Sequence, residues 1–187
     1  MCDEEREAIA ALQRGDIGGL EALVRLHQLR AVRTSFAITG DRETAEDVVA
    51  EAFLTVYERI SQFDSRRPFA PWFYRIVING SLKAIRRTQR TLVHAGGIGV
   101  LDQWRDQLSG PEEASLTQEM REHLLEAVRA LPPKQRAALI LRYYLEMDDG
   151  EIGKTLGCPR GTVKWRLHAA RQRLRQTLQT YYSGEGG

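Results

Sequence analysis

The chain contains little cysteine and no long apolar run, and these shortages exclude several classes of protein. Its 187 residues include only two cysteines, Cys2 and Cys158, so a disulfide framework is not expected. No run of about 18 apolar residues occurs, which argues against a membrane-spanning helix. The first residues are acidic and lack the apolar core of a signal peptide, so we expect a cytoplasmic protein without membrane insertion.

The sequence also lacks the groups of residues that hold metals or carry out catalysis. The four histidines are scattered, and none stands at metal-ligand spacing from a cysteine or a cluster of carboxylates. No pattern pairs a nucleophile with a base. We therefore expect no cofactor and no enzymatic activity.

Acidic residues are missing from two long stretches, although the net charge of the whole chain is only +2. Between Asp64 and Asp102, and again between Glu151 and Glu185, every charged side chain is lysine or arginine. Charge sorted in this way is typical of surfaces that meet a polyanion such as nucleic acid. Two such stretches, far apart in the sequence, predict two DNA contacts in one protein.

Apolar residues recur at three- and four-residue spacing through most of the chain, which predicts an all-α protein without a sheet. The pattern dissolves between residues 88 and 115, where several glycines occur. Because so long a loop is unusual inside a domain, we interpret it as a flexible linker. The predicted organisation is two small helical domains, residues 1–90 and 116–187, joined by a linker over residues 91–115.

A helix predicted to follow Gly40 has one acidic side and one apolar side. Asp41 is placed to cap this helix, and Tyr57 is among the apolar residues expected to be buried. The opposite side carries Glu43, Glu46, Asp47, Glu51 and Glu58. Such a face can dock a basic partner, but it is more often only a solvated surface, and the pattern leaves both interpretations open.

The first acid-free stretch places aromatic rings and cations on one helix, predicted from Phe69 to about Arg87. Rings that stack on unpaired bases, with cations that hold the backbone, are typical of proteins that bind single strands. Helical spacing equally favours a core position for Trp72, Phe73 and Ile76, so both alternatives stay open. Asn79, on the same helix, is a candidate contact to a base or a phosphate.

The second acid-free stretch fits the mechanics of a helix-turn-helix unit. Gly157 can supply a left-handed turn residue between a short helix and a longer one that begins near Arg160. The second helix of such a unit lies in the major groove, where its first residues reach base edges. The alternative is a plain amphipathic hairpin with a basic face, but turn residue, spacing and charge together favour DNA binding. The predicted outward side chains are Arg160, Thr162, Lys164, Trp165, Arg166 and His168.

The order of these parts resembles a bacterial sigma factor of the extracytoplasmic-function group within the sigma-70 family. Residues 41–53 (DRETAEDVVAEAF) resemble the family's core-polymerase-binding segment in region 2. Phe69 with residues 72–79 (WFYRIVIN) resembles its promoter-melting and −10 recognition segment. Three further segments resemble region 4: residues 131–136 (LPPKQR), 150–157 (GEIGKTLG) and 161–171 (GTVKWRLHAAR).

The resemblance implies a transcription initiation factor with a region 2 helical bundle and a region 4 helix-turn-helix. Such a factor binds core RNA polymerase, recognises the −10 and −35 promoter elements and helps to melt the promoter. It has no catalytic activity, because the phosphodiester chemistry belongs to the polymerase. The implied partners are the clamp and flap regions of core polymerase, duplex and single-stranded promoter DNA, and, as in many members of the family, an anti-sigma factor.

The resemblance also implies roles for individual residues. The loop over residues 62–69 would hold a flipped base, whose unstacking is offset by contacts in the pocket. Core polymerase would bind Glu46, Asp47, Glu51 and Phe53. The −10 element would be contacted by Phe69, Trp72, Tyr74, Arg75, Asn79, Lys83, Arg86 and Arg87. The −35 element would be contacted by Arg160, Thr162, Lys164, Trp165, Arg166, His168 and Arg171.

A different function stays open beside this one, namely a stand-alone helix-turn-helix regulator that binds duplex DNA without a polymerase. The aromatic segment 69–79 argues against it, because such a regulator has no need to stack on single strands. Four residues depart from the family's usual pattern: Phe73 stands in place of leucine, Val77 of alanine, Lys83 of aspartate and Trp165 of serine. The first two are expected in the core, whereas Trp165 lies in the predicted recognition helix.

Overall fold

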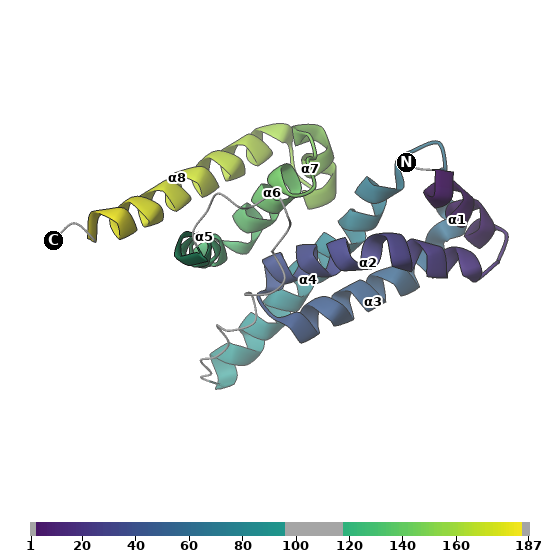
Figure 1. The fold of residues 1–187 in the computed structure, drawn as a ribbon, viewed down its shortest axis with the longest axis horizontal. Helices are drawn as coiled ribbons and strands as arrows, with labels where there is room; N and C mark the ends of the chain where they lie inside the picture. The colour runs from purple at the N-terminus through teal and green to yellow at the C-terminus, as the bar shows by residue number, and fades with distance from the viewer. Residues whose placement is uncertain (1–2, 96–117, 185–187) are drawn as a thin grey trace. The chain divides into compact units, whose positions relative to one another are not determined.

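The computed structural model describes residues 3–95 and 118–184, and within these ranges the chain forms helices and no strand. The chain divides into two compact units, Met1–His94 and Ala95–Gly187 (Figure 1). The predicted all-α fold is thereby confirmed for the described ranges. Residues 96–115 of the predicted linker lie outside them, and the exact domain boundaries stay a prediction.

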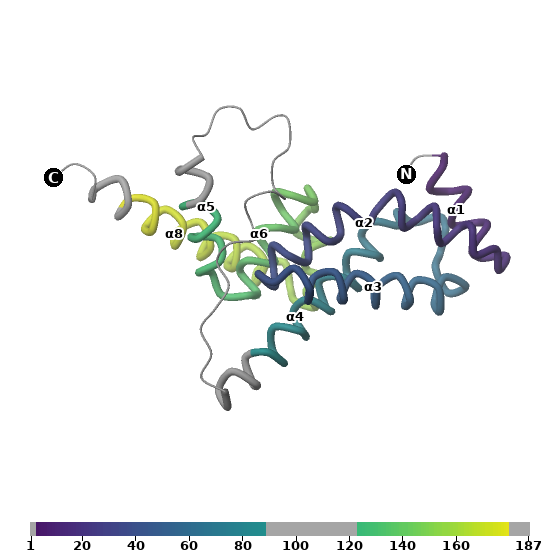
Figure 2. Tube along the Cα trace, turned by 60° about the horizontal axis from the view of Figure 1, so that its bottom comes forward, coloured from purple at the N-terminus to yellow at the C-terminus, as the bar shows by residue number. Residues whose placement is uncertain are grey.

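The first unit is a helical bundle in which α2 and α3 lie side by side and α1 packs against α2 (Figure 2). The approach of α1 to α2 depends on Gly19, because a Cβ atom there would collide with the carbonyl oxygen of Ala8. In chain order the elements are α1 (Asp3–Gln13), α2 (Gly18–Thr39), α3 (Arg42–Arg59), the short 3-10 helix η1 (Ile60–Gln62) and α4 (Phe69–Ala95).

The turn between α2 and α3 follows the sequence prediction. Gly40 ends α2 in the left-handed conformation, with φ of 78°, and its N–H donates to the carbonyl oxygen of Phe36. The Asp41 carboxylate then accepts a hydrogen bond of 2.8 Å from the backbone N–H of Thr44. Both predicted roles, the glycine stop and the aspartate cap, are confirmed.

Helix α4 packs its apolar side against α2 and α3. Phe73 and Val77 are fully buried, as expected for their core positions, and the Phe73 ring lies 4.8 Å from that of Phe53 on α3. The hydroxyl groups of Ser35 on α2 and Ser81 on α4 are 2.9 Å apart. The helix runs beyond the predicted end near residue 87, because no glycine or proline interrupts the sequence between Ser81 and Ala95.

The second unit contains α5 (Gln118–Ala130), α6 (Pro133–Tyr143), α7 (Asp149–Leu156) and α8 (Arg160–Gly184). Helix α8 contacts the other three, and Leu141, Ile152 and Val163 are fully buried between them. The buried side chain of Arg136 donates a hydrogen bond of 2.7 Å to the carbonyl oxygen of Arg129, near the end of α5. This contact satisfies a helix-terminal carbonyl and ties α6 to α5.

Two kinds of feature are absent from the described part of the chain. Among the helices of residues 3–95 and 118–184, none is both long enough and apolar enough to cross a membrane. In the same ranges, no three His, Cys, Asp or Glu side chains are grouped so that they could hold a metal ion.

Candidate nucleic-acid interfaces

One side of α4 presents cations to solvent without any acid. Its exposed residues recur every three or four positions, so they project from the same side of the helix. Trp72 stands at the start of this row and is half-buried. We call this row the α4 face, and its exposed members are Arg75, Asn79, Lys83, Arg86 and Arg87.

Two residues predicted to contact the −10 element lie in the core instead. Phe69 is fully buried and Tyr74 is 2% exposed. The Phe69 ring stacks on that of Phe73, with centroids 5.6 Å apart. Helical spacing turns these rings toward α2 and α3 rather than toward solvent, so they support the α4 face from beneath and cannot stack on bases in this conformation.

Trp72 occupies the border between this aromatic core and the surface. Its ring centroid lies 5.0 Å from that of Phe63 and 5.7 Å from that of Phe69, so part of the indole is packed. The rest stays accessible at the start of the α4 face. Of the three aromatic residues predicted to contact the −10 element, only Trp72 is placed where a base could reach it.

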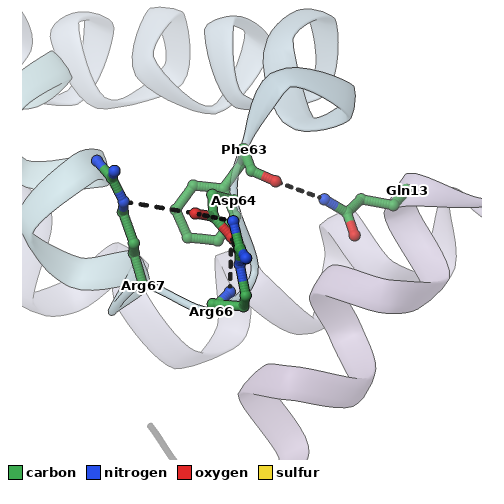
Figure 3. A network of polar contacts seen from close by, with 5 residues as sticks. All are labelled: Gln13, Phe63, Asp64, Arg66 and Arg67. Carbon is green, nitrogen blue, oxygen red and sulfur yellow. Dashed lines mark hydrogen bonds and ion pairs between the residues drawn. The ribbon is translucent and has the colours of Figure 1, made fainter.

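The loop that leads into α4 is a compact turn with two outward cations (Figure 3). The Asp64 carboxylate accepts hydrogen bonds from the backbone N–H and Nε of Arg66, at 3.1 and 2.8 Å, and pairs with Nε of Arg67 at 3.5 Å. The bonds from the Arg66 side chain and backbone hold the pKa of the Asp64 carboxyl below its usual range. Arg66 and Arg67 keep 89% and 80% of their side chains exposed, so both can meet a phosphate.

The predicted polymerase-binding helix, α3, combines acids with apolar residues on its outer side. Glu46, Asp47 and Glu51 are exposed, and Glu46 accepts a hydrogen bond from Arg42. The fourth predicted residue, Phe53, is only 6% exposed and packs in the core, and its contact with polymerase stays a prediction.

Among the acids of α3, Leu54 and Tyr57 are 61% and 51% exposed. The prediction that Tyr57 is buried is wrong, and the exposure of Leu54 is an additional finding of the structure. Counting 100° per residue places Leu54 at the centre of the acidic side and Tyr57 within it, next to Glu46. A surface that mixes acid with exposed apolar groups is better suited to a protein partner than an acidic surface alone.

Helix α7 begins with a reciprocal cap. The Asp148 carboxylate accepts from the N–H groups of Gly150 and Glu151, at 2.6 and 2.9 Å, and the Glu151 side chain accepts from the Asp148 N–H. These backbone bonds hold the pKa of the Asp148 carboxyl below its usual range. At the other end, Gly157 has φ of 60°, which confirms its predicted turn role.

A second glycine, which the sequence patterns did not reveal, brings α7 and the turn together. A Cβ atom at Gly153 would lie 2.7 Å from the carbonyl oxygen of Cys158 and 3.7 Å from the Val163 side chain. Only glycine leaves room for this approach. Gly153 therefore sets the position of the first turn of α8.

The outer side of α8 carries most of the residues predicted to contact the −35 element. Trp165 is 62% exposed, Thr162 is half-buried, and the side chain of Arg166 donates to the Cys158 sulfur at 3.2 Å. Arg160 is exposed, but its guanidinium lies over the start of α7, against Gly150. We call this surface the α8 face, and its exposed members are Arg160, Lys164, Trp165, His168 and Arg171.

Both units are similar in sequence to known proteins. A family model described as "Sigma-70 region 2" matches residues 23–91, and one described as "Sigma-70, region 4" matches residues 121–174. The chain is 29% identical to the ECF RNA polymerase sigma factor SigW of Bacillus subtilis over 180 residues, which cover 93% of this chain and 96% of that protein. It is 28% identical to the ECF RNA polymerase sigma-E factor of Escherichia coli, over 91% of this chain and 92% of that protein.

Solved structures share the fold. CnrH, solved in complex with the cytosolic domain of CnrY, matches with a TM-score of 0.67 and 20% identity over 95% of this chain and 99% of that one. The sigma factor RpoE of Bartonella quintana, solved with the anti-sigma factor NepR, matches with a TM-score of 0.65 and 23% identity over 85% of this chain and 94% of that one. At 20% and 23% identity, these matches show a shared fold alone.

Proposed function

This chain belongs to the sigma-70 family of RNA polymerase sigma factors, in its extracytoplasmic-function group, and we propose that it directs core RNA polymerase to promoters and helps to open them. The observation that carries the proposal is the presence, in one chain, of matches to region 2 and region 4. Each matched region includes a cationic face free of acid. A stand-alone regulator needs only the second of these regions.

The outer side of α3 is the proposed contact with the clamp of core polymerase. Glu46, Asp47 and Glu51 offer carboxylates to a basic partner, and Leu54 and Tyr57 offer apolar area beside them. Apolar area at the centre of a charged patch is typical of interfaces that bind with both affinity and orientation. Phe53 supports this surface from the core.

The α4 face is the proposed contact with the opened −10 element. Arg75, Lys83, Arg86 and Arg87 hold the strand backbone, while Asn79 reaches a base or phosphate and Trp72 offers its accessible ring edge. The loop over residues 62–69 takes up a flipped base. Unstacking that base costs a few kcal/mol, which contacts in the loop offset.

The α8 face is the proposed contact with the −35 duplex. A helix of this kind places its N-terminal half in the major groove, where Lys164, Trp165 and His168 reach base edges and Arg171 a phosphate. Arg160 and Arg166 lie against α7 and the turn, from which they can turn toward DNA. Thr162, half-buried at the start of α8, completes the set.

The chain works with core polymerase in the cytoplasm, and it leaves the phosphodiester chemistry to the polymerase. It is proposed to bind an anti-sigma factor, as the similarly folded RpoE of Bartonella quintana does in its solved complex. No cofactor takes part.

Reconstituted transcription tests the proposed function. The purified full chain is added to core polymerase with a library of genomic fragments, and run-off transcripts are sequenced. We expect discrete start sites that share −10 and −35 sequences and that are absent when either protein is omitted. No start site above the level of core polymerase alone, together with binding of duplex DNA by the chain alone, would instead establish the stand-alone regulator.

A further inference from the structure

The geometry points to Gln13 as a positioning residue for the loop between η1 and α4, an inference that rests on the proposed function of that loop. Gln13 is the last residue of α1 and lies outside residues 23–91, which match the region 2 model. Its side-chain Nε2 donates hydrogen bonds to the carbonyl oxygens of Ile60, at 3.1 Å, and Phe63, at 2.9 Å. Figure 3 shows the bond to Phe63. The acceptors stand 47 and 50 positions further along the chain.

The chemistry of the contact suits glutamine. A primary amide carries two N–H donors on one nitrogen, so one side chain can serve two carbonyl groups at once. The Ile60 carbonyl also accepts the N–H of Phe63 at 3.0 Å, which closes the turn of η1. Gln13 therefore fixes both ends of the Ile60–Phe63 turn from a different helix.

Phe63 connects the η1 turn, which Gln13 holds, to the proposed base-binding loop. At Phe63 the backbone becomes extended, with φ of −78° and ψ of 126°, and the chain leaves η1 for the loop. The Phe63 ring is 7% exposed, packs at 5.0 Å from Trp72 and meets Phe69 edge-on at 5.7 Å. A shift of the Phe63 backbone would therefore move Trp72 and the start of the α4 face.

The other polar contacts of the loop are local and cannot replace Gln13. Asp64 binds Arg66 and Arg67, all within the loop, so these bonds shape the turn without tying it to the rest of the unit. Arg66 and Arg67 are exposed, where ion pairs contribute little. Gln13 supplies the long-range polar tie, and its loss should loosen the loop while the helices stay packed.

Three variants of the full chain test the role of Gln13. Gln13→Met removes both donors at nearly the same side-chain length, whereas Gln13→Lys keeps donors within reach of the two carbonyl groups. Gln28→Met makes the same change at an exposed position of α2 and serves as the matched control. Amide hydrogen exchange of residues 61–67 is measured in the free protein. Run-off transcription is then measured on a reconstituted promoter and on single-base variants of its −10 and −35 elements.

For Gln13→Met we expect exchange about fivefold faster in the loop, and a three- to tenfold smaller preference for the native −10 base, roughly the loss of one or two hydrogen bonds. The penalty for −35 variants and the affinity for core polymerase should not change. Gln13→Lys and Gln28→Met should behave as the parent chain does.

The other outcomes distinguish a failure of the role of Gln13 from a failure of the proposed function. If exchange is unchanged in Gln13→Met, the hydrogen bonds of Gln13 do not hold the loop. If exchange is faster but the −10 preference is unchanged, Gln13 holds the loop without positioning it for the −10 base. A parent chain that yields no promoter-specific transcript overturns the proposed function, while the exchange measurement still decides whether Gln13 holds the loop.

Discussion

The α4 face rests on a layer of buried aromatic rings, whereas the α8 face rests on aliphatic side chains and a glycine contact. The buried side of α4 carries Phe69 and Phe73, while the buried side of the start of α8 carries Val163 and packs against Gly153 of α7. A thick aromatic layer holds a helix rigidly against its own bundle and suits a surface on which a flexible single strand is ordered. A close glycine contact instead sets the angle of a helix that must enter a groove of fixed width.

The largest effect is expected from adding a methyl group at Gly153. Gly153→Ala places a carbon 2.7 Å from the Cys158 carbonyl oxygen, so the backbone must shift. We expect the second unit to lose about 1–3 kcal/mol of stability, as overpacked sites do. Chemical denaturation measures this loss, and −35-dependent transcription should fall with it while binding of single-stranded −10 DNA persists.

Gly161→Ala is the matched control, because a Cβ atom there meets nothing within 4 Å. Alanine is the better helix former, so this change should be neutral or should stabilise the unit by up to about 1 kcal/mol. Equal losses for the two variants would mean that Gly153 does not set the position of α8.

Charge removal tests whether the two faces recognise different forms of DNA. Arg86→Ala with Arg87→Ala should weaken binding of the polymerase complex to a forked −10 template about tenfold, or 1.4 kcal/mol, because phosphate contacts are lost. Binding to a −35 duplex should be unaffected. Lys164→Ala with Arg171→Ala should give the reverse pattern, and equal effects of both pairs on both templates would break the division between the faces.

The helical periods and turn residues were strong enough in the sequence to give the fold. Gly40, Asp41 and Gly157 act as predicted because their conformations and caps depend on near neighbours. The sequence alone did not decide which aromatic residues face the core and which face solvent. Phe69 and Tyr74 could have faced either a base or the core, and only their packing against other helices decides between these.

Contacts between distant segments could not be predicted from the pattern. The hydrogen bonds of Gln13 span about fifty positions, and the need for glycine at Gly153 arises from a carbonyl group beyond the turn. Neither residue belongs to a periodic or charged pattern. The exposure of Leu54, by contrast, could be predicted by counting 100° per residue along the helix.

Trp165 offers a finer test of the α8 face. Trp165→Ser restores the residue that the family usually carries and removes an indole that is 62% exposed. We expect a change in preference at one or two −35 positions of about 1 kcal/mol, with the affinity for non-specific DNA nearly unchanged. Selection of −35 sequences from a random library measures this preference. An identical selected sequence would show that Trp165 does not read bases.

The smallest expected effect concerns pH and the support of the α4 face. His27 lies against the rings of Phe69 and Phe73, and its Nε2 is 2.8 Å from a carboxylate oxygen of Glu5. Burial lowers the pKa of His27 from 6.5, although Glu5 acts to raise it and Arg30 to lower it. The neutral ring then donates its Nε2 hydrogen to Glu5.

Because the folded chain binds a proton at His27 less readily than the unfolded chain, the free energy of unfolding should fall as the pH drops below 6.5. The loss should continue until the pH passes the lower pKa of the folded state. His27→Gln keeps a donor for Glu5 but cannot titrate, so its unfolding free energy should vary less with pH across this window. Urea titrations at several pH values measure these profiles, and a His27→Gln profile as steep as that of the parent chain would show that the proton binds elsewhere.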